Sequence, residues 1–463
     1  MRLGLPHLLA AIVSMALLFP SASAEAQAAL RPGGGVKVGT GGGGTPDLSP
    51  RLPGGPLFGL DGEGTPPKLP GTDGQPQNQG PHDPDLLVVV FRSGTPDGTT
   101  TDFAGAFKLT IEKQFQLAGL KLRVFLMRIP AGANLDDVLK RATADQRPLW
   151  VQPDYRYQSL QSTQGTSGSV PTGAASKQYA LQRIHADDLP QAARGQGITV
   201  ALIDSGVQRD HESLKSDHVT TIDLVSGKDN PPAETHGTVL ASIIAGSGKV
   251  QGLAPAVDLL AIRAFAEIDP KTGASEADSF RVSQAVSIAL DHRVRIINMS
   301  IGGPNDPVVR MAIEQAVLTG TIVVAAAGNA GPDAPPIYPA AQTGVIAVTA
   351  TDAKDRIFDG ANRGDYIAVA APGVDVLAAR PGRSPGASAY DYFTGTSMAT
   401  GYATGLVAVL LSADPKLSAT DLRHILETSA TDLGPPKKDP EFGWGRIDAA
   451  AALSATPTVG AAN

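Results

Sequence analysis

From about Lys177 onward, strand-like apolar runs alternate with segments of helical spacing, and this alternation restricts the fold more than any other feature. It is typical of a parallel sheet with helices on both faces. The expected strands are 197–204, 257–265, 295–301, 321–328, 345–351 and 366–373, and the expected helices are 237–245, 275–292, 307–319, 397–412 and 419–429. We therefore predict an α/β domain with a doubly wound parallel sheet over residues 177–455, followed by a tail, 456–463.

A small α+β unit is expected over residues 85–158, ahead of the sheet domain. Its segments predict the order strand, helix, strand, helix, strand at 86–91, 101–118, 120–129, 134–143 and 149–157. Residues 159–176 are rich in Gly, Ser, Thr and Gln and are interpreted as a linker.

The first 24 residues have the pattern of a secretory signal. Arg2 supplies a positive start, the apolar run 8–19 is too short to span a bilayer comfortably, and 22–24 offers small residues for cleavage. An uncleaved membrane anchor is the alternative. Residues 25–84 are interpreted as a disordered linker, because they are dominated by Gly and Pro. We expect a secreted or periplasmic protein without a stable membrane anchor.

Composition excludes several classes of function. The net charge is −7 and no basic stripe is present, so nothing indicates a nucleic-acid partner. The chain has no cysteine, which excludes disulfides, thiolate catalysis and cysteine metal sites.

Four polar residues fall at strand ends or helix starts, where chemistry collects in a parallel sheet. Asp204 and Asn329 end strands, His236 opens a helix, and Ser397 opens an apolar helix whose positive end favours negative charge. Each also has a structural interpretation: a cap or turn for Asp204, a satisfied histidine, a turn asparagine and an N-cap serine. Together, an acid, a histidine and a serine at one sheet edge form an orienter, base and nucleophile.

The order Asp, His, Ser along the chain is that of subtilisin, and no G-x-S-x-G elbow surrounds Ser397. Over about residues 177–453 the chain resembles the subtilisin-like serine proteases, the subtilases. The matching segments, in family order, are ALIDSGV (201–207), HGTVLASIIAG (236–246), GLAP (252–255), NMSIGG (298–303), AAAGN (325–329), VAAPGV (369–374) and GTSMAT (395–400).

The resemblance implies a role for each residue. Asp204 would orient, His236 would act as general base and acid, and Ser397 would be the nucleophile. Asn329 would donate to the oxyanion together with the Ser397 backbone N–H. The segments NMSIGG and AAAGN would wall a cleft that binds an extended peptide as an added strand, with Ser300, Ile301, Gly302, Ala326 and Gly328 as substrate-binding residues.

Residues 85–158 resemble the family's ferredoxin-like propeptide, which assists folding and inhibits the enzyme until it is cut away. The resemblance implies a maturation cut near or after Gln158, within the linker. A permanent extra domain is the alternative.

The chain departs from the family at three places. Gly401-Tyr402 stands where most relatives have Pro-His, which puts the rigidity of the helix in doubt. Residues 247–251 are shorter than the loop that holds the family's tight calcium ion, so we expect that site to be absent and no cofactor to be required. Asp352, Asp355 and Asp359 could hold a weak ion, with a solvated loop as the alternative.

The third departure is Ile337, where many relatives have Gly at the base of the primary specificity pocket. A branched side chain would shrink this pocket. We therefore predict a small or medium, uncharged residue such as Ala or Val before the scissile bond.

These features predict an exported serine endopeptidase that acts on polypeptides as a monomer and is made as a self-processed zymogen with its propeptide as inhibitor. Two alternatives remain from the sequence. One is a catalytically impaired homologue that binds peptides, and the other is an esterase or transferase with the same triad.

Overall fold

The structure is a computed structural model that describes residues 80–160, 163–164, 178–187, 189–225, 235–269, 274–382 and 388–457. The chain divides into two compact units, 1–70 and 71–463, and all described residues belong to the second. The predicted signal peptide, nearly all of the linker 25–84, most of the linker 159–176 and the end of the tail lie outside the described residues. We call residues 80–160 the N-terminal module and residues 178–457 the main module.

Seven parallel strands form the sheet of the main module, in the order β15-β14-β13-β11-β6-β8-β7. Their bounds are β6 Thr199–Asp204, β7 Val219–Asp223, β8 Asp258–Arg263, β11 Ile296–Met299, β13 Ile322–Ala326, β14 Ile346–Thr351 and β15 Ile367–Pro372. The chain winds from β6 first toward β7 and then toward β15, so the predicted doubly wound α/β sheet is confirmed. The sequence analysis missed β7, an edge strand whose side chains are mostly exposed.

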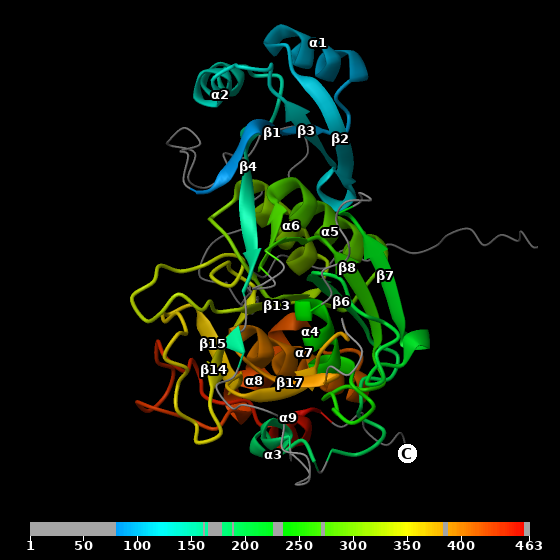
Figure 1. The fold of residues 1–463 in the computed structure, drawn as a ribbon, viewed down its shortest axis with the longest axis vertical. Helices are drawn as coiled ribbons and strands as arrows, with labels where there is room; N and C mark the ends of the chain where they lie inside the picture. Colours follow the sequence, from blue (N-terminus) through cyan, green and yellow to red (C-terminus); the bar gives the residue numbers. More distant parts are fainter. Residues whose placement is uncertain are drawn as a thin grey trace, which may run out of the picture. The chain divides into compact units, whose positions relative to one another are not determined.

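Helices cover both faces of this sheet (Figure 1). Helices α4 (Thr235–Ala245) and α7 (Thr396–Ala413) pack together against one face, and α5 (Ser279–Asp291) and α6 (Pro307–Leu318) pack together against the other. The main module also contains α3 (Tyr179–Arg183), η2 (Ser216–His218), α8 (Ala419–Ser429) and α9 (Ala449–Ala455). Helix α7 is long and apolar enough to cross a membrane, but 89% of it is buried inside the protein. It is therefore the core helix of a folded domain.

One predicted helix of the main module was partly wrong. The segment expected to be helical over 275–292 starts with strand β10 (Ala274–Asp278), and α5 begins only at Ser279. Asp278 caps α5 by accepting a hydrogen bond from the Arg281 N–H at 2.7 Å. Ahead of this cap, Ser275 and Ala277 alternate with less buried neighbours, as in a strand. Strand β10 pairs with β9 (Ala266–Asp269) and with the N-terminal module.

The N-terminal module has the order βαββαβ. Its elements are β1 His82–Arg92, α1 Asp97–Phe107, β2 Thr110–Leu117, η1 Ala118–Leu120, β3 Leu122–Arg128, α2 Leu135–Thr143 and β4 Trp150–Ser159. The predicted helix over 101–118 was wrong in its second half. Lys108 adopts a left-handed conformation that ends α1, and residues 110–117 then pair with β3 as a strand.

Strand β4 belongs to both modules. Its first part pairs with β1, and its last residues pair with β10 and with β12 (Ile301–Gly302). A separate three-stranded sheet joins β16 (Val376–Ala379) and β17 (Tyr390–Thr394) to β5 (Thr163–Gln164). The end of β4 and residues 163–164 are thus each paired with a strand of the main module.

Candidate active site

Asp204 and His236 meet at the carboxyl edge of the central sheet. Asp204 is the last residue of β6, and His236 lies in the first turn of α4. The Nδ1 atom of His236 is 2.8 Å from Oδ1 and 2.9 Å from Oδ2 of Asp204. Asp204 is fully buried and His236 is 7% exposed, so this contact is shielded from water. The carboxylate therefore fixes the orientation of the ring, as an orienter must.

The environment of His236 favours its charged form. Burial by itself lowers the pKa of the imidazole, but the negative charge of Asp204 and its hydrogen bond outweigh burial. The backbone of Leu160 acts in the same direction, so the pKa of His236 is raised above its ordinary value. A histidine of this kind stabilises the proton that it would take from a nucleophile.

Ser397 lies in the first turn of α7 and is fully buried. The N-cap of this helix is Gly395, so the interpretation of Ser397 as a capping residue was wrong. Gly395 has a φ of 156°, and a Cβ atom there would lie 3.0 Å from Nδ2 of Asn329. The close approach favours glycine at this turn.

Thr396 positions the side chain of Asn329. The oxygen Oδ1 of Asn329 accepts hydrogen bonds from the backbone N–H of Thr396 at 3.0 Å and from its Oγ1 at 2.9 Å. Because the oxygen end of the amide is held, the direction of its Nδ2 donors is fixed as well. Donors that are held before the reaction stabilise developing negative charge well. The sequence analysis missed Thr396, although the GTSMAT segment contains it.

The carbonyl group of Leu160 occupies the site. Ser397 Oγ donates a hydrogen bond to the Leu160 oxygen at 2.9 Å, and the Leu160 N–H donates to the Ser300 oxygen at 3.2 Å. The residue that follows strand β4 thus presents its backbone to the serine, and its backbone also lies against His236.

The residues on either side of Leu160 lie as added strands. Ser159 pairs with Ile301, and Gln158 pairs with Gly302, in antiparallel register. After Leu160, Thr163 and Gln164 pair with β17. This is the way in which an extended peptide binds to a sheet edge, with main-chain hydrogen bonds on both sides of one peptide bond.

Small residues make room for the side chains of this segment. A Cβ atom on Gly302 would lie 2.2 Å from Cδ1 of Ile337 and 3.0 Å from Cδ2 of Leu160, so these two side chains lie around Gly302. A Cβ atom on Gly303 would lie 2.4 Å from the ring of Tyr157. The sequence analysis missed Gly303, although the double glycine of NMSIGG was a signal for such an approach.

The other two predicted substrate-binding residues, Ala326 and Gly328, shortly precede Asn329 in the chain. Ala326 ends β13 and is fully buried. Gly328 adopts a φ of 113°, and its N–H donates to Thr396 Oγ1 at 3.2 Å. Gly328 thus adjoins Asn329 and contacts Thr396, whereas Ser300, Ile301 and Gly302 pair with the segment 158–160 and Ile337 lies beside Gly302.

The departure at Gly401-Tyr402 has a packing reason. A Cβ atom on Gly401 would lie 2.9 Å from Cγ2 of Ile243, so glycine lets α7 approach α4 closely. Tyr402 is fully buried, and burial raises its pKa well above the ordinary range. Helix α7 runs unbroken from Thr396 to Ala413, so the glycine does not interrupt it.

The acidic residues proposed for a weak ion are largely paired with arginine. Asp355 binds both Arg183 and Arg446, and Asp352 binds Arg356 at 2.6 Å. Among the described residues, no group of three or more His, Cys, Asp or Glu side chains could hold a metal ion. Whether a cofactor is required therefore stays a prediction.

The side-chain amide of Gln178 binds the backbone at the end of the short segment 247–251. Gln178 Oε1 accepts from the Gln251 N–H at 2.7 Å, and its Nε2 donates to the Gln251 oxygen at 2.8 Å. Both main-chain polar groups of Gln251 are therefore satisfied by one neutral residue.

Comparison with known proteins places this geometry in a family. Residues 195–445, more than half of the chain, match the model of the subtilase family, Peptidase_S8. Subtilisin DY of Bacillus licheniformis is 34% identical over 265 residues, which cover 55% of this chain and 92% of subtilisin DY. The minor extracellular protease Epr of Bacillus subtilis (strain 168) is 29% identical over 371 residues, which cover 78% of this chain and 53% of Epr.

A solved structure shares the fold. The crystal structure of fervidolysin from Fervidobacterium pennivorans, described as a keratinolytic enzyme related to subtilisin, superposes with a TM-score of 0.67 at 24% identity. The match covers 82% of this chain and 62% of the fervidolysin chain. The chain thus spans about half the length of Epr and under two thirds of fervidolysin. On the family match, and with subtilisin DY covered almost completely, this chain belongs to the subtilase family.

Proposed function

We propose that this protein is an exported serine endopeptidase that is made as a precursor and cuts itself after Leu160. The observation that carries the proposal is the hydrogen bond between Ser397 Oγ and the Leu160 carbonyl oxygen, at a site where Asp204 holds His236. The pairing of the flanking residues with β12 and β17 supports an extended peptide as the substrate.

The proposed reaction begins with attack of Ser397 Oγ on the carbonyl carbon, while His236 takes the serine proton. The negative charge that develops on the carbonyl oxygen is stabilised by the Asn329 side-chain amide and the Ser397 backbone N–H. His236 then gives its proton to the leaving amine, which is released with the downstream chain. A water molecule, activated by His236, hydrolyses the acyl-enzyme and restores the serine.

The segment 157–160 also suggests what the cleft prefers. Leu160 lies where the residue before the scissile bond belongs, against Gly302 and Ile337. It is bulkier than the Ala or Val that the sequence analysis favoured for this pocket, so we propose a medium-sized apolar residue. Chromogenic peptides that end in Leu, Val, Ala or Phe test this preference, and fastest cleavage after Phe would contradict it.

In this proposal the N-terminal module is the propeptide and inhibits the enzyme in cis, since its last strand fills the cleft. Secretion through the predicted signal peptide agrees with the similarity to Epr, which is named as an extracellular protease. We further propose a monomer that needs no cofactor. The impaired-homologue alternative rested on Gly401-Tyr402, and the close packing of Gly401 on α4 gives that glycine a structural role that speaks in favour of an active enzyme.

A casein assay beside an ester assay tests the reaction class, with wild type and Ser397→Ala purified in parallel. We expect wild type to cleave both substrates and Ser397→Ala to cleave neither. Ester hydrolysis without casein cleavage would instead indicate an esterase. No activity of wild type on either substrate, after removal of the N-terminal module, would contradict the proposal.

A further inference from the structure

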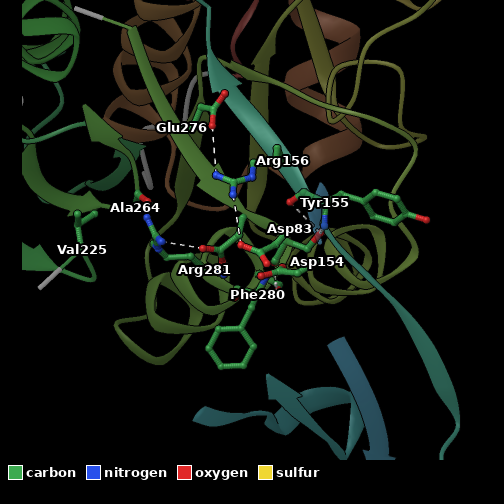
Figure 2. A network of polar contacts seen from close by, with 12 residues as sticks. Asp83, Asp154, Tyr155, Arg156, Val225, Ala264, Glu276, Phe280 and Arg281 are labelled. Carbon is green, nitrogen blue, oxygen red and sulfur yellow. Dashed lines mark hydrogen bonds and ion pairs between the residues drawn. The ribbon is translucent and has the colours of Figure 1, made fainter. Parts of the chain in front are cut away.

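A group of acidic side chains, two of them buried, lies where strand β4 crosses from the N-terminal module onto the main module. Figure 2 shows Asp154 of β4 beside Phe280 at the start of α5, with Asp83 close by and Arg156 between Asp83 and Glu276. Asp154 is fully buried. The triad chemistry proposed above makes no use of this group.

One oxygen of Asp154 has a partner and the other has none. Oδ1 accepts from the Phe280 N–H at 3.1 Å, at the N-terminus of α5. Oδ2 is buried and has no hydrogen-bond partner among the described residues. A buried oxygen of an ionised carboxylate is costly without a donor, whereas a protonated carboxyl group leaves no bare charge.

A second buried carboxyl group lies nearby. Asp306 caps α6 and accepts from Val308 and Val309, and it also accepts from Gln152 Nε2 at 2.8 Å and from the Ser279 hydroxyl. Asp306 therefore accepts more hydrogen bonds than Asp154 does. When both groups are ionised, each opposes the charge of the other.

The two nearby cations are already engaged by other acids. Arg156 of β4 contacts Asp83 of β1 and Glu276 of β10, each at 3.3 Å. Arg281 of α5 binds Asp278 of β10 at 2.7 Å. Three further titratable side chains lie at the group. Tyr155 and Tyr157 of β4 are close enough to feel the charge of Asp306, and the ring of His82 of β1 packs edge-on against Tyr155. Both arginines are therefore already paired with carboxylates other than Asp154.

We propose that Asp154 is a proton-dependent latch between the two modules. In the closed precursor Asp154 is a neutral carboxylic acid, and its ionisation weakens the hold of the N-terminal module on the main module. Acidic conditions would keep the cleft filled, and a rise in pH would release it. This proposal concerns regulation of the site described above and therefore rests on the proposed function.

The electrostatics of the closed form agree with this direction. Burial raises the pKa of Asp154 well above its usual value, and the charges of Asp278, Asp306 and Asp83 add to that effect against the Phe280 hydrogen bond. Once the module has left, the exposed carboxyl group returns to a pKa near 3.9. Closing therefore takes up a proton at any pH between these two values. The affinity is greatest at low pH and falls, by at most about tenfold per pH unit and proton, up to the raised pKa.

The test measures binding without relying on protease activity. A Ser397→Ala chain receives a recognition sequence for an unrelated, specific protease within residues 165–177 and is cut there. Sedimentation of the cut protein from pH 5 to pH 9 then gives the dissociation constant of the two fragments. We expect this constant to rise with pH. A constant that does not change over this range would overturn the proposal, whatever the activity of wild type.

Asp154→Asn separates the latch from a simple structural role. The amide keeps the shape and the Phe280 hydrogen bond but cannot ionise, so we expect a shallower pH slope and tighter binding than wild type at pH 9. Asp136→Asn, at an exposed position on α2, is the matched control and should keep the wild-type slope. Weaker binding of Asp154→Asn by the same factor at every pH would show that Asp154 acts only as a hydrogen-bond acceptor for Phe280, and would overturn the latch.

A second variant keeps the test decisive if Asp154→Asn does not fold. Asp278→Asn retains the cap of α5, because asparagine is an equally good N-cap. It removes a negative charge that opposes ionisation of Asp154. The rise in the dissociation constant begins at the pKa of the free carboxyl group and ends at the raised pKa of the closed form, so we expect it to end at a lower pH than in wild type. A rise that ends at the same pH as in wild type would contradict the role of Asp154.

Discussion

The Asp204–His236 pair determines how activity depends on pH. The pKa of His236 is raised with a peptide segment in the cleft, and the base must be neutral to act. We therefore expect the acidic limb of kcat, which reports the substrate complex, to lie above the ordinary histidine pKa of about 6.5. In Asp204→Asn, kcat should fall by about 10⁴-fold, because the ring loses its orienter. A pH series of kcat for both proteins measures these effects.

A second Asp–His pair offers a control for this experiment. His218 Nδ1 lies 2.9 Å from Asp258 Oδ1, and both side chains are about half exposed. Asp258→Asn should leave the pH profile of kcat unchanged. An Asp204→Asn protein with wild-type kcat would contradict the assignment of Asp204 as orienter.

Asn329 is expected to act on the transition state rather than on binding of the substrate. Asn329→Ala should lower kcat by about 10²- to 10³-fold, the loss known for an oxyanion-hole asparagine in a relative of this protein, with KM little changed. Thr396→Val keeps the backbone N–H that holds Asn329 Oδ1 but removes the hydroxyl bond. It should therefore lower kcat by less than Asn329→Ala does. A purely structural role would lower stability in both variants without this order in kcat.

At the scale of elements, α4, which carries His236, packs against α7, which carries Ser397. Gly401→Val would place carbon atoms where Ile243 now lies, because even a Cβ atom comes within 2.9 Å. We expect the free energy of unfolding to fall by about 1–3 kcal/mol. Urea unfolding in a Ser397→Ala background measures it without autolysis. Gly105→Ala in α1, where a Cβ atom meets nothing within 4 Å, is the control and should not destabilise.

The short segment 247–251 leads to a prediction about metal removal. Gln178 satisfies both main-chain groups of Gln251, so this contact needs no ion. We expect EDTA to leave the melting temperature of the mature enzyme unchanged, and Gln178→Ala to lower it. A drop of several degrees with EDTA that calcium restores would contradict this expectation.

Elements with a strong pattern could be predicted from the sequence, and elements stabilised by distant partners could not. The buried strands of the central sheet are nearly continuous apolar runs, so β6, β13 and β14 were predicted. Strand β2 is mostly exposed and is stabilised by pairing with β3, and β10 is stabilised by pairing with β4 and β9. Local periodicity does not reveal pairing with distant strands, so the sequence pattern wrongly predicted helix for both segments.

The same distinction applies to the site. Asp204, His236, Asn329 and Ser397 could be proposed because each lies in a short recognisable segment at a strand end or helix start. The position of Leu160 could not, because it depends on main-chain pairing of β4 with β12 across the molecule. The register of β4 on β12 therefore decides which residue lies next to Ser397, and the composition of the linker does not reveal that register.

At the scale of the whole molecule, the N-terminal module and the main module share strand β4, and the chain beyond it passes the serine before pairing with β17. The central claim is that the segment around Leu160 is bound as a substrate by the catalytic residues of its own chain. Intact mass and N-terminal sequencing of the secreted wild type and of Ser397→Ala test it directly. We expect wild type to begin at Gln161, or to be trimmed from there, while Ser397→Ala keeps the N-terminal module attached. Both proteins beginning at the same residue would contradict the claim.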